Sequence, residues 1–306
     1  GLNYFCNRKQ ILIAGYPAIA MAYIQEEFDP AITGTVMGIF VSGNSIGGLL
    51  GRLLVSTTAD FYSWQTAITV IGIICTLISF WFYMKLPASQ NFTVRRPSPR
   101  ELCARFRENL HSPELLCFYL IGFFIMGSFV TLYNYIEYPL IAPPYSLSQT
   151  LVGFIFVIYL CGTFSSAFMG RLADAHGAEK MLFSSLLIML TGVLLTLLQP
   201  LAGKIMGIAV FTFGFFGAHS IASGCVVKVN PQGKVQSSGL YLLFYYIGSS
   251  LMGAGGGKFL QSQGWSGVVL FISIALILAM GTAVFLLLDK KFLSAPVFTS
   301  HYKNQH

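Results

Sequence analysis

Long apolar segments separated by short polar stretches follow one another along almost the whole chain of 306 residues. A helix needs about 20 mostly apolar residues to cross roughly 30 Å of hydrocarbon. Open sheets cannot cross lipid, because the polar groups at their edges would be unsatisfied, and these segments are too long for barrel strands. We therefore predict an all-α polytopic membrane protein with about nine transmembrane helices, at residues 11–26, 33–57, 64–86, 114–139, 149–172, 180–198, 205–228, 237–260 and 266–288.

The composition agrees with a chain that has little water-facing surface. Hydrophobic residues make up 55% of the sequence and charged residues only 9%, whereas soluble domains contain about 25% charged residues. A soluble enzyme and a nucleic-acid-binding protein are therefore disfavoured. The six cysteines are dispersed, and the sequence has no C-x-x-C or H-E-x-x-H spacing, no nucleophile elbow and no cofactor motif. We expect no catalytic residues, no metal site and no cofactor, with an intramembrane enzyme as a distant alternative.

The basic residues distinguish the two faces of the predicted bundle. The chain has 18 Lys and Arg against 11 Asp and Glu, and its only long polar stretch covers residues 87–113. If that stretch is cytoplasmic, thirteen of the 18 basic residues lie on its side, which is the bias expected of cytoplasmic loops. We predict three parts: a partial N-terminal bundle of three helices at 1–86, a basic cytoplasmic linker at 87–113, and a six-helix C-terminal bundle with a short cytoplasmic tail at 114–306.

A weak internal repeat relates the second and eighth apolar segments. Residues 43–51 align with residues 248–256 at an offset of 205, and the two copies lie six helices apart. This spacing predicts two halves of six helices each, so we expect three further helices to precede Gly1. Glycines let membrane helices approach closely. We predict helix-packing roles for those in and beside the two copies: Gly43, Gly47, Gly48, Gly51, Gly248, Gly253 and Gly256.

A second pattern lies between the fifth and sixth segments, where residues 170–177 spell GRLADAHG. This octapeptide resembles the G-x-L-a-D-x-x-G loop signature of the major facilitator superfamily. Several stretches also resemble the YnfM-like bacterial inner-membrane permeases of that superfamily, which are relatives of the arabinose-efflux type: GNSIGG at 43–48, MGSFVTLYNYI at 126–136, GFFGAHSIAS at 214–223 and SGLYLLFYYIGSS at 238–250. The resemblance spans about residues 11–288 and implies two six-helix bundles in parallel repeat, with the first three helices lying outside this sequence.

The resemblance implies a secondary active transporter of the inner membrane that works by alternating access. It further implies proton-coupled export of a small organic solute by a monomer, with the solute, protons and the lipid bilayer as partners and no nucleic acid. Direction and coupling follow from the resemblance and not from the residues. A facilitator or importer of a small metabolite, and a truncated remnant that does not transport, stay open as alternatives.

In the resemblance, the loop signature acts as a conformational latch between the two halves. Its candidate residues are Gly170, Arg171, Asp174 and Gly177. A carboxylate is stabilised at the positive N-terminus of a helix, so Asp174 could cap the helix that begins near Thr33 and Gly34. The alternative is an ordinary loop with solvated charges.

Ionisable residues inside a bilayer are costly and are therefore candidates for function. His219 lies about fourteen residues, or about 21 Å, into its predicted helix. An imidazole changes charge near neutral pH, which suits proton coupling, although a neutral His219 bonded to a neighbour is equally compatible with the sequence. Glu137 near the outer end of the fourth segment could couple protons or bind a cation, or could be an interfacial carboxylate.

Polar residues of the fourth segment extend this candidate coupling and substrate pathway. Ser128, Thr131 and Asn134 follow one another at i, i+3 and i+6, which keeps them on one flank of a helix. Together with the neighbouring Tyr133, they predict a polar stripe that faces the transport pathway.

Overall fold

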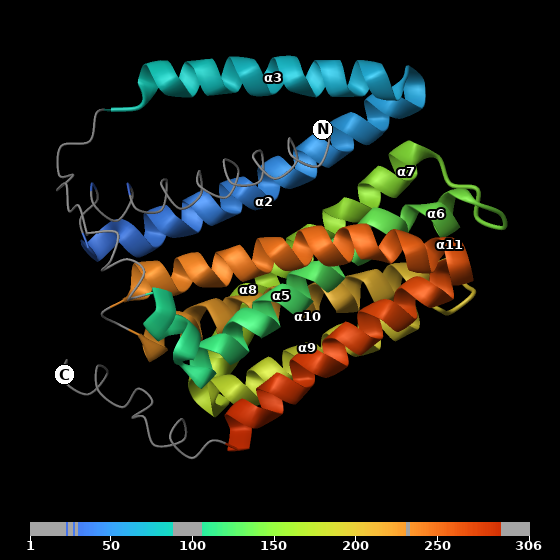
Figure 1. Ribbon diagram of the computed structural model, residues 1–306. Helices are drawn as coiled ribbons and strands as arrows, with labels where there is room; N and C mark the ends of the chain where they lie inside the picture. Colours follow the sequence, from blue (N-terminus) through green and yellow to red (C-terminus); the bar gives the residue numbers. More distant parts are fainter. Residues whose placement is uncertain (1–22, 24–26, 28–29, 88–105, 231–232, 289–306) are drawn as a thin grey trace, which may run out of the picture. The chain divides into compact units, whose positions relative to one another are not determined.

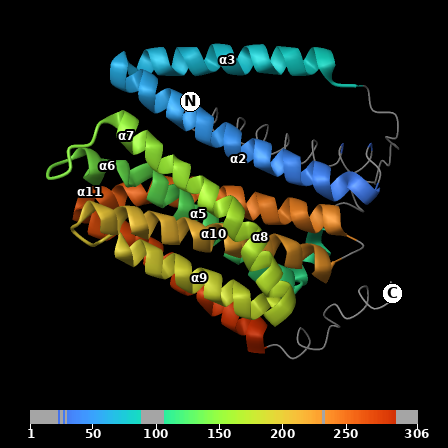
Figure 2. The same ribbon diagram turned by 180° about the vertical axis from the view of Figure 1, so that it is seen from behind.

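The computed structural model describes residues 23, 27, 30–87, 106–230 and 233–288, and every regular element in this part of the chain is a helix (Figure 1). Figure 2 shows the same helices from behind. In chain order they are α2 (Pro30–Phe61), α3 (Trp64–Lys85), α5 (Pro113–Tyr135), α6 (Glu137–Ile141), α7 (Gln149–Phe154), the 3₁₀-helix η1 (Ile155–Ile158), α8 (Tyr159–His176), α9 (Ala178–Leu195), α10 (Leu201–Val229) and α11 (Lys234–Leu288).

The chain forms two compact units. The first unit contains Gly1–Pro97 and Leu140–Tyr159, and the second unit contains Ser98–Pro139 and Leu160–His306. Helices α2, α3, α7 and η1 therefore lie in the first unit, whereas α5, α9, α10, α11 and most of α8 lie in the second. The three parts expected from the sequence, with boundaries at residues 86 and 113, stay a prediction.

Several helices begin where the sequence supplies a capping hydroxyl. Ser63 precedes α3 and accepts a hydrogen bond from the Thr66 backbone N–H at 3.2 Å. Ser112 does the same for the backbone N–H of Leu115 at 3.4 Å, and the first residue of α5 is Pro113. A hydroxyl at the N-cap satisfies one of the free N–H groups of the first turn, and proline is tolerated there because no N–H is needed.

Helix α11 is interrupted at Gly264, which has φ 64° and ψ −150°. This left-handed conformation is accessible to glycine because it lacks a Cβ. The rings of Phe259 and Phe271 stack across the interruption with centroids 4.5 Å apart, so the two parts of α11 pack beside each other. They correspond to the separate segments predicted at 237–260 and 266–288.

Several of the helices are apolar and long enough to cross a membrane. Six candidate spans occur among the described residues, and one of them, Gln236–Leu288, contains both parts of α11. Helix α2 covers the predicted segment at 33–57 but is not among the six, and the segment at 11–26 lies largely outside the described residues. The prediction of an all-helical protein with several apolar helices is confirmed, and the count of nine helices stays a prediction.

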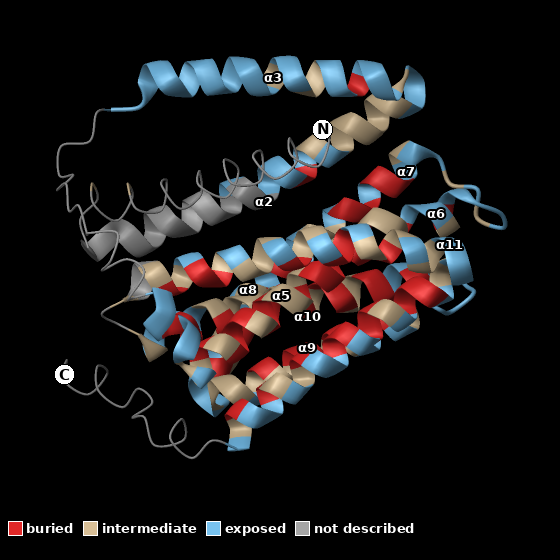
Figure 3. Ribbon diagram, in the orientation of Figure 1, coloured by how far each residue is buried: buried red, intermediate tan, exposed pale blue. Residues whose placement is uncertain are grey.

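The core of the second unit lies where α5 packs along α11 and α10 packs along α9. Figure 3 shows buried residues concentrated on α5 and α10 and few on α3. Large side chains are fully buried in this core, including Tyr119, Phe211 and Tyr241.

Helix α3 of the first unit has a different character, because Ala67 is its one buried residue. Its apolar side chains are exposed along the whole helix, including Ile73, Leu77 and Trp81. Such a surface is unsuited to water and suits a hydrocarbon environment.

Candidate functional site

One polar contact in the second unit's core is a hydrogen bond between two spanning helices. His219 on α10 lies with its Nδ1 2.9 Å from the hydroxyl oxygen of Tyr241 on α11. Aromatic rings surround the half-buried imidazole: Phe215 lies nearly parallel to it at 6.1 Å between centroids, and Tyr245 lies at 4.8 Å. The Tyr241 ring is buried and passes directly beside Gly122 of α5. The structure thus places His219 in an aromatic cage with one hydroxyl partner.

A second buried hydrogen bond joins α5 to α10. The hydroxyls of Tyr133 and Thr212 are 2.7 Å apart. Since the Thr212 hydroxyl donates to the Ile208 carbonyl oxygen, Tyr133 is the donor of the pair. Ser128, one turn earlier on α5, is fully buried, and its hydroxyl has no hydrogen-bond partner among the described residues.

The remaining polar residues of α5 lie toward the glycine-rich side of α11. Thr131 is buried, donates to the Gly127 carbonyl oxygen at 2.7 Å, and packs its methyl group where a Cβ at Gly256 would lie. The Asn134 amide nitrogen would lie 3.7 Å from a Cβ at Gly253. Of the four predicted pathway residues of this segment, Tyr133 therefore contacts α10, whereas Thr131 and Asn134 lie against α11.

Glu137 is placed away from the His219 cage. It begins the short helix α6, and its side chain is exposed. The cage itself consists of Phe215, Tyr241 and Tyr245. Within the described ranges, no three His, Cys, Asp or Glu side chains gather closely enough to hold a metal ion.

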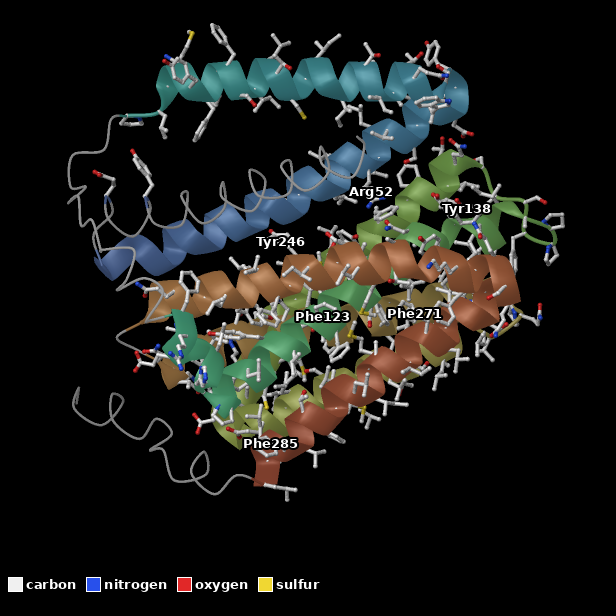
Figure 4. All side chains as sticks on the ribbon, viewed as in Figure 1. Arg52, Phe123, Tyr138, Tyr246, Phe271 and Phe285 are labelled. Carbon is white, nitrogen blue, oxygen red and sulfur yellow. The ribbon has the colours of Figure 1, made fainter. Side chains whose placement is uncertain are left out.

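The predicted glycines of α11 lie at the closest approach of α11 to α5. A Cβ at Gly248 would overlap the backbone of Phe123, whose side chain is labelled on α5 in Figure 4. A Cβ at Gly253 would lie 3.0 Å from Val130, and one at Gly256 would lie 2.7 Å from the Tyr135 ring. The backbones approach this closely because side chains are absent at these positions.

Their repeat partners on α2 have more space. A Cβ at Gly43, Gly47 or Gly48 would meet no described atom within 4 Å, and one at Gly51 would lie 3.7 Å from Ile71 of α3. The packing role predicted for these four glycines stays a prediction.

The predicted latch residues lie at the end of α8 and the start of α9. Asp174, in the last turns of α8, forms an exposed ion pair with Lys228 at the end of α10, with an N–O distance of 3.5 Å. Gly177 has φ 99° and connects α8 to α9 without a longer loop. Gly170 faces Ser220, and Arg171 is exposed. The start of α2, which Asp174 was expected to cap, belongs to the other unit, so that contact stays a prediction.

Sequence reasoning missed a buried cation at the opposite end of α10. Lys204 is only 7% exposed, and its ammonium group donates to the Thr196 carbonyl oxygen at 2.7 Å. The indole N–H of Trp265 donates to the Thr196 hydroxyl at 3.1 Å. Cations stabilise the carbonyl end of a helix, here α9. A lysine within the first turn of an apolar helix was the available signal.

The family comparison covers nearly the whole chain. The chain matches the family model of the Major Facilitator Superfamily over residues 11–138 and 135–299.

Several curated proteins are similar to it. The uncharacterized MFS-type transporter YybF of Bacillus subtilis is 42% identical over 270 residues, covering 88% of this chain and 67% of that protein. The inner membrane transport protein YnfM of Escherichia coli K12 is 38% identical over 268 residues, covering 88% and 64%. A probable sugar efflux transporter of Mannheimia succiniciproducens is 24% identical over 231 residues, covering 74% and 55%. The chain spans about two thirds of the length of the first two relatives.

Proposed function

The chain belongs to the Major Facilitator Superfamily, and from this premise we propose that it is a secondary active transporter that exports a small organic solute in exchange for protons. The observation that carries the coupling is the His219–Tyr241 hydrogen bond between two spanning helices. The printed names of the relatives support transport in general, and those of YnfM and the Mannheimia protein support the inner membrane and export. We propose transport by alternating access of a monomer, with no enzymatic step.

The geometry around His219 suits a group that gains and loses a proton. A neutral imidazole has one accepting and one donating nitrogen, whereas a protonated imidazole donates from both. The bond between Nδ1 and the Tyr241 hydroxyl can therefore persist in both states, with the hydroxyl donating in one and accepting in the other.

The test is solute-driven proton movement in proteoliposomes that hold the purified full-length protein and the pH dye pyranine. A panel of monocarboxylates, sugars and amphipathic cations is offered, and uptake of the labelled solute is followed in parallel. We expect at least one solute to change the luminal pH with the wild-type protein. His219→Gln should keep solute exchange down its own gradient and lose the proton movement.

The matched control is His111→Gln, because His111 is an exposed histidine near the start of the second unit, and its Nδ1 lies 2.7 Å from the Arg107 carbonyl oxygen. This variant should behave as the wild type. Proton movement that survives in His219→Gln would contradict coupling through His219. Solute exchange without any proton movement in the wild type would identify a facilitator, and absence of exchange with every solute would contradict transport.

A further inference from the structure

Helix α2 and the α7–η1 segment of the first unit make three successive contacts. Asp60 near the end of α2 accepts from the Thr150 hydroxyl at 2.7 Å. One turn earlier on α2, Ser56 lies directly against Gly153, where a Cβ would overlap its hydroxyl. One further turn brings the guanidinium of Arg52 over the ring of Phe156, 4.8 Å from its centroid. The two segments thus lie side by side from Asp60 to Arg52.

Arg52 is deep within α2. It lies nine residues before Phe61, the last residue of the helix, which is about 14 Å along the axis. Half of a hydrocarbon layer is roughly 15 Å thick. A helix that ends at the interface therefore carries this guanidinium close to the middle of the bilayer, where a charged side chain is costly and is kept for function or for a charged partner.

No charged partner occurs in the described part of the first unit. Its acidic residues there are Glu27, which precedes α2, and Asp60, which lies eight residues from Arg52 and is bonded to Thr150. The Arg52 side chain is exposed, and Figure 4 shows it projecting from α2. Among the described residues, its guanidinium forms no ion pair and no hydrogen bond; its contact is with the Phe156 ring. Its five N–H donors are thus available to a ligand.

We propose that Arg52 binds the carboxylate of an organic monoanion, whose apolar body lies against the half-buried ring of Tyr159. This proposal rests on the proposed transport function, because it names the substrate class. The planar guanidinium donates two parallel hydrogen bonds to a carboxylate, and stacking on an aromatic face holds its plane fixed.

The surroundings of Arg52 favour a single negative charge and an apolar body. Lys85, the other basic residue in the described part of this unit, is the last residue of α3 and lies at the end of that helix remote from its junction with α2. A single guanidinium neutralises only one of the two negative charges of a dianion. The remaining charge is unfavourable near the middle of the bilayer. The ring of Tyr159 meets that of Phe156 edge to face, with the centroids 5.6 Å apart. The accessible part of the Tyr159 ring suits the hydrocarbon part of an aryl or alkyl carboxylate.

The proposal is tested by ligand-induced thermal stabilisation of the purified full-length protein in detergent. The probes are benzoate, phenylacetate and octanoate, with benzamide as the neutral isostere and phenyl phosphate as the dianion. We expect at least one carboxylate to raise the unfolding midpoint in a saturable way, and benzamide and phenyl phosphate to have little effect. Arg52→Gln should abolish the shift, and Arg52→Lys should weaken binding by about tenfold or more, because the bidentate charged hydrogen bonds are lost.

Lys258→Gln is the matched control, since Lys258 is an exposed cation in the candidate span Gln236–Leu288. This variant should respond as the wild type does. The proposal is overturned if none of the carboxylates stabilises the protein, if benzamide equals benzoate, or if Arg52→Gln responds like the wild type. If Arg52→Gln does not fold, Arg52→Lys takes its place, and a thermal shift equal to that of the wild type in this variant overturns the proposal.

Failure of this proposal and failure of the proposed function give different results. If a sugar or a cation drives proton movement and no carboxylate binds, the Arg52 proposal is wrong and proton-coupled transport stands. If carboxylates bind through Arg52 and no solute crosses the membrane, the binding site stands and the proposed transport function is wrong.

Discussion

The carboxylate of Asp60 at the end of α2 accepts two hydrogen bonds from Thr150 in the first turn of α7, from the hydroxyl at 2.7 Å and from the backbone N–H at 3.3 Å. A carboxylate is stabilised there because the first turn of a helix presents free N–H groups. The hydrogen bond from the Thr150 hydroxyl is the largest cause that lowers the pKa of Asp60 below its ordinary value. Two segments 90 residues apart in the sequence are thereby joined through one side chain.

This contact predicts a pH dependence of stability. The folded protein holds the pKa of Asp60 below its unfolded value, so the contact contributes fully above the unfolded pKa and is lost as the pH falls through the lowered folded pKa. Asp60→Asn should lower the unfolding midpoint slightly at neutral pH, and the difference from the wild type should vanish in acid. The measurement is thermal unfolding at a series of pH values. A difference that persists unchanged into strong acid would show that the carboxylate charge plays no part.

Gly248 and Gly43 occupy equivalent positions of the repeat. Because α5 and α11 approach each other closely, we predict that alanine at Gly248 lowers the stability of the protein more than alanine at Gly43 does. Gly248→Ala would place a Cβ against the backbone of Phe123, which cannot rotate away as a side chain could. Overpacking of this kind destabilises by about 1–3 kcal/mol. Gly43→Ala is the matched control, because a Cβ there meets nothing described within 4 Å. Alanine also has the higher helix propensity, so Gly43→Ala should be neutral or slightly stabilising.

The measurement for both variants is thermal unfolding followed by a thiol-reactive dye. Cys117 and Cys225 are free and buried, so they become reactive when the second unit unfolds. Equal midpoints for the two variants would refute the packing role of Gly248.

The Asp174–Lys228 pair predicts an effect on transport that exceeds its effect on stability. Both side chains are more than half exposed, and exposed ion pairs contribute about 0–1 kcal/mol. Asp174→Asn should therefore leave the unfolding midpoint nearly unchanged. If the pair belongs to a latch, this variant should slow solute exchange, and the exchanged pair Asp174→Lys with Lys228→Asp should restore part of the rate. Lys180→Gln, an exposed neighbour, serves as the control, and full activity of Asp174→Asn would remove the latch.

Hydropathy was sufficient to locate most helices, because the length of an apolar segment is imposed by the bilayer. The polar stretch around Gly264 correctly separated two helices, since only glycine there accommodates the left-handed turn. Helix α10 begins at Leu201, four residues before the predicted segment at 205–228, so that Lys204 lies inside the helix. The structure buries it against the Thr196 carbonyl oxygen.

Partners across helices could not be deduced from periodicity. The spacing of Thr131 and Asn134 shows that they share one flank of α5, but it does not show which helix covers that flank. In the structure it is α11, because the glycines of α11 leave room for these two side chains. His219 and Tyr241 are 22 residues apart, and their hydrogen bond depends on how α10 and α11 are rotated about their axes. Arg52 is one of 18 basic residues in the sequence, and its contact with Phe156 depends on how α2 lies beside η1.

The left-handed residue in α11 has a consequence for the orientation of the protein in the membrane. An unbroken helix of 55 residues would be about 82 Å long, more than twice the thickness of the hydrocarbon layer. The chain instead reverses at Gly264 within a single residue and crosses back beside itself. Each reversal adds one crossing of the membrane and therefore moves the end of the chain to the opposite face. The single residue Gly264 thus determines on which face of the membrane Leu288 lies.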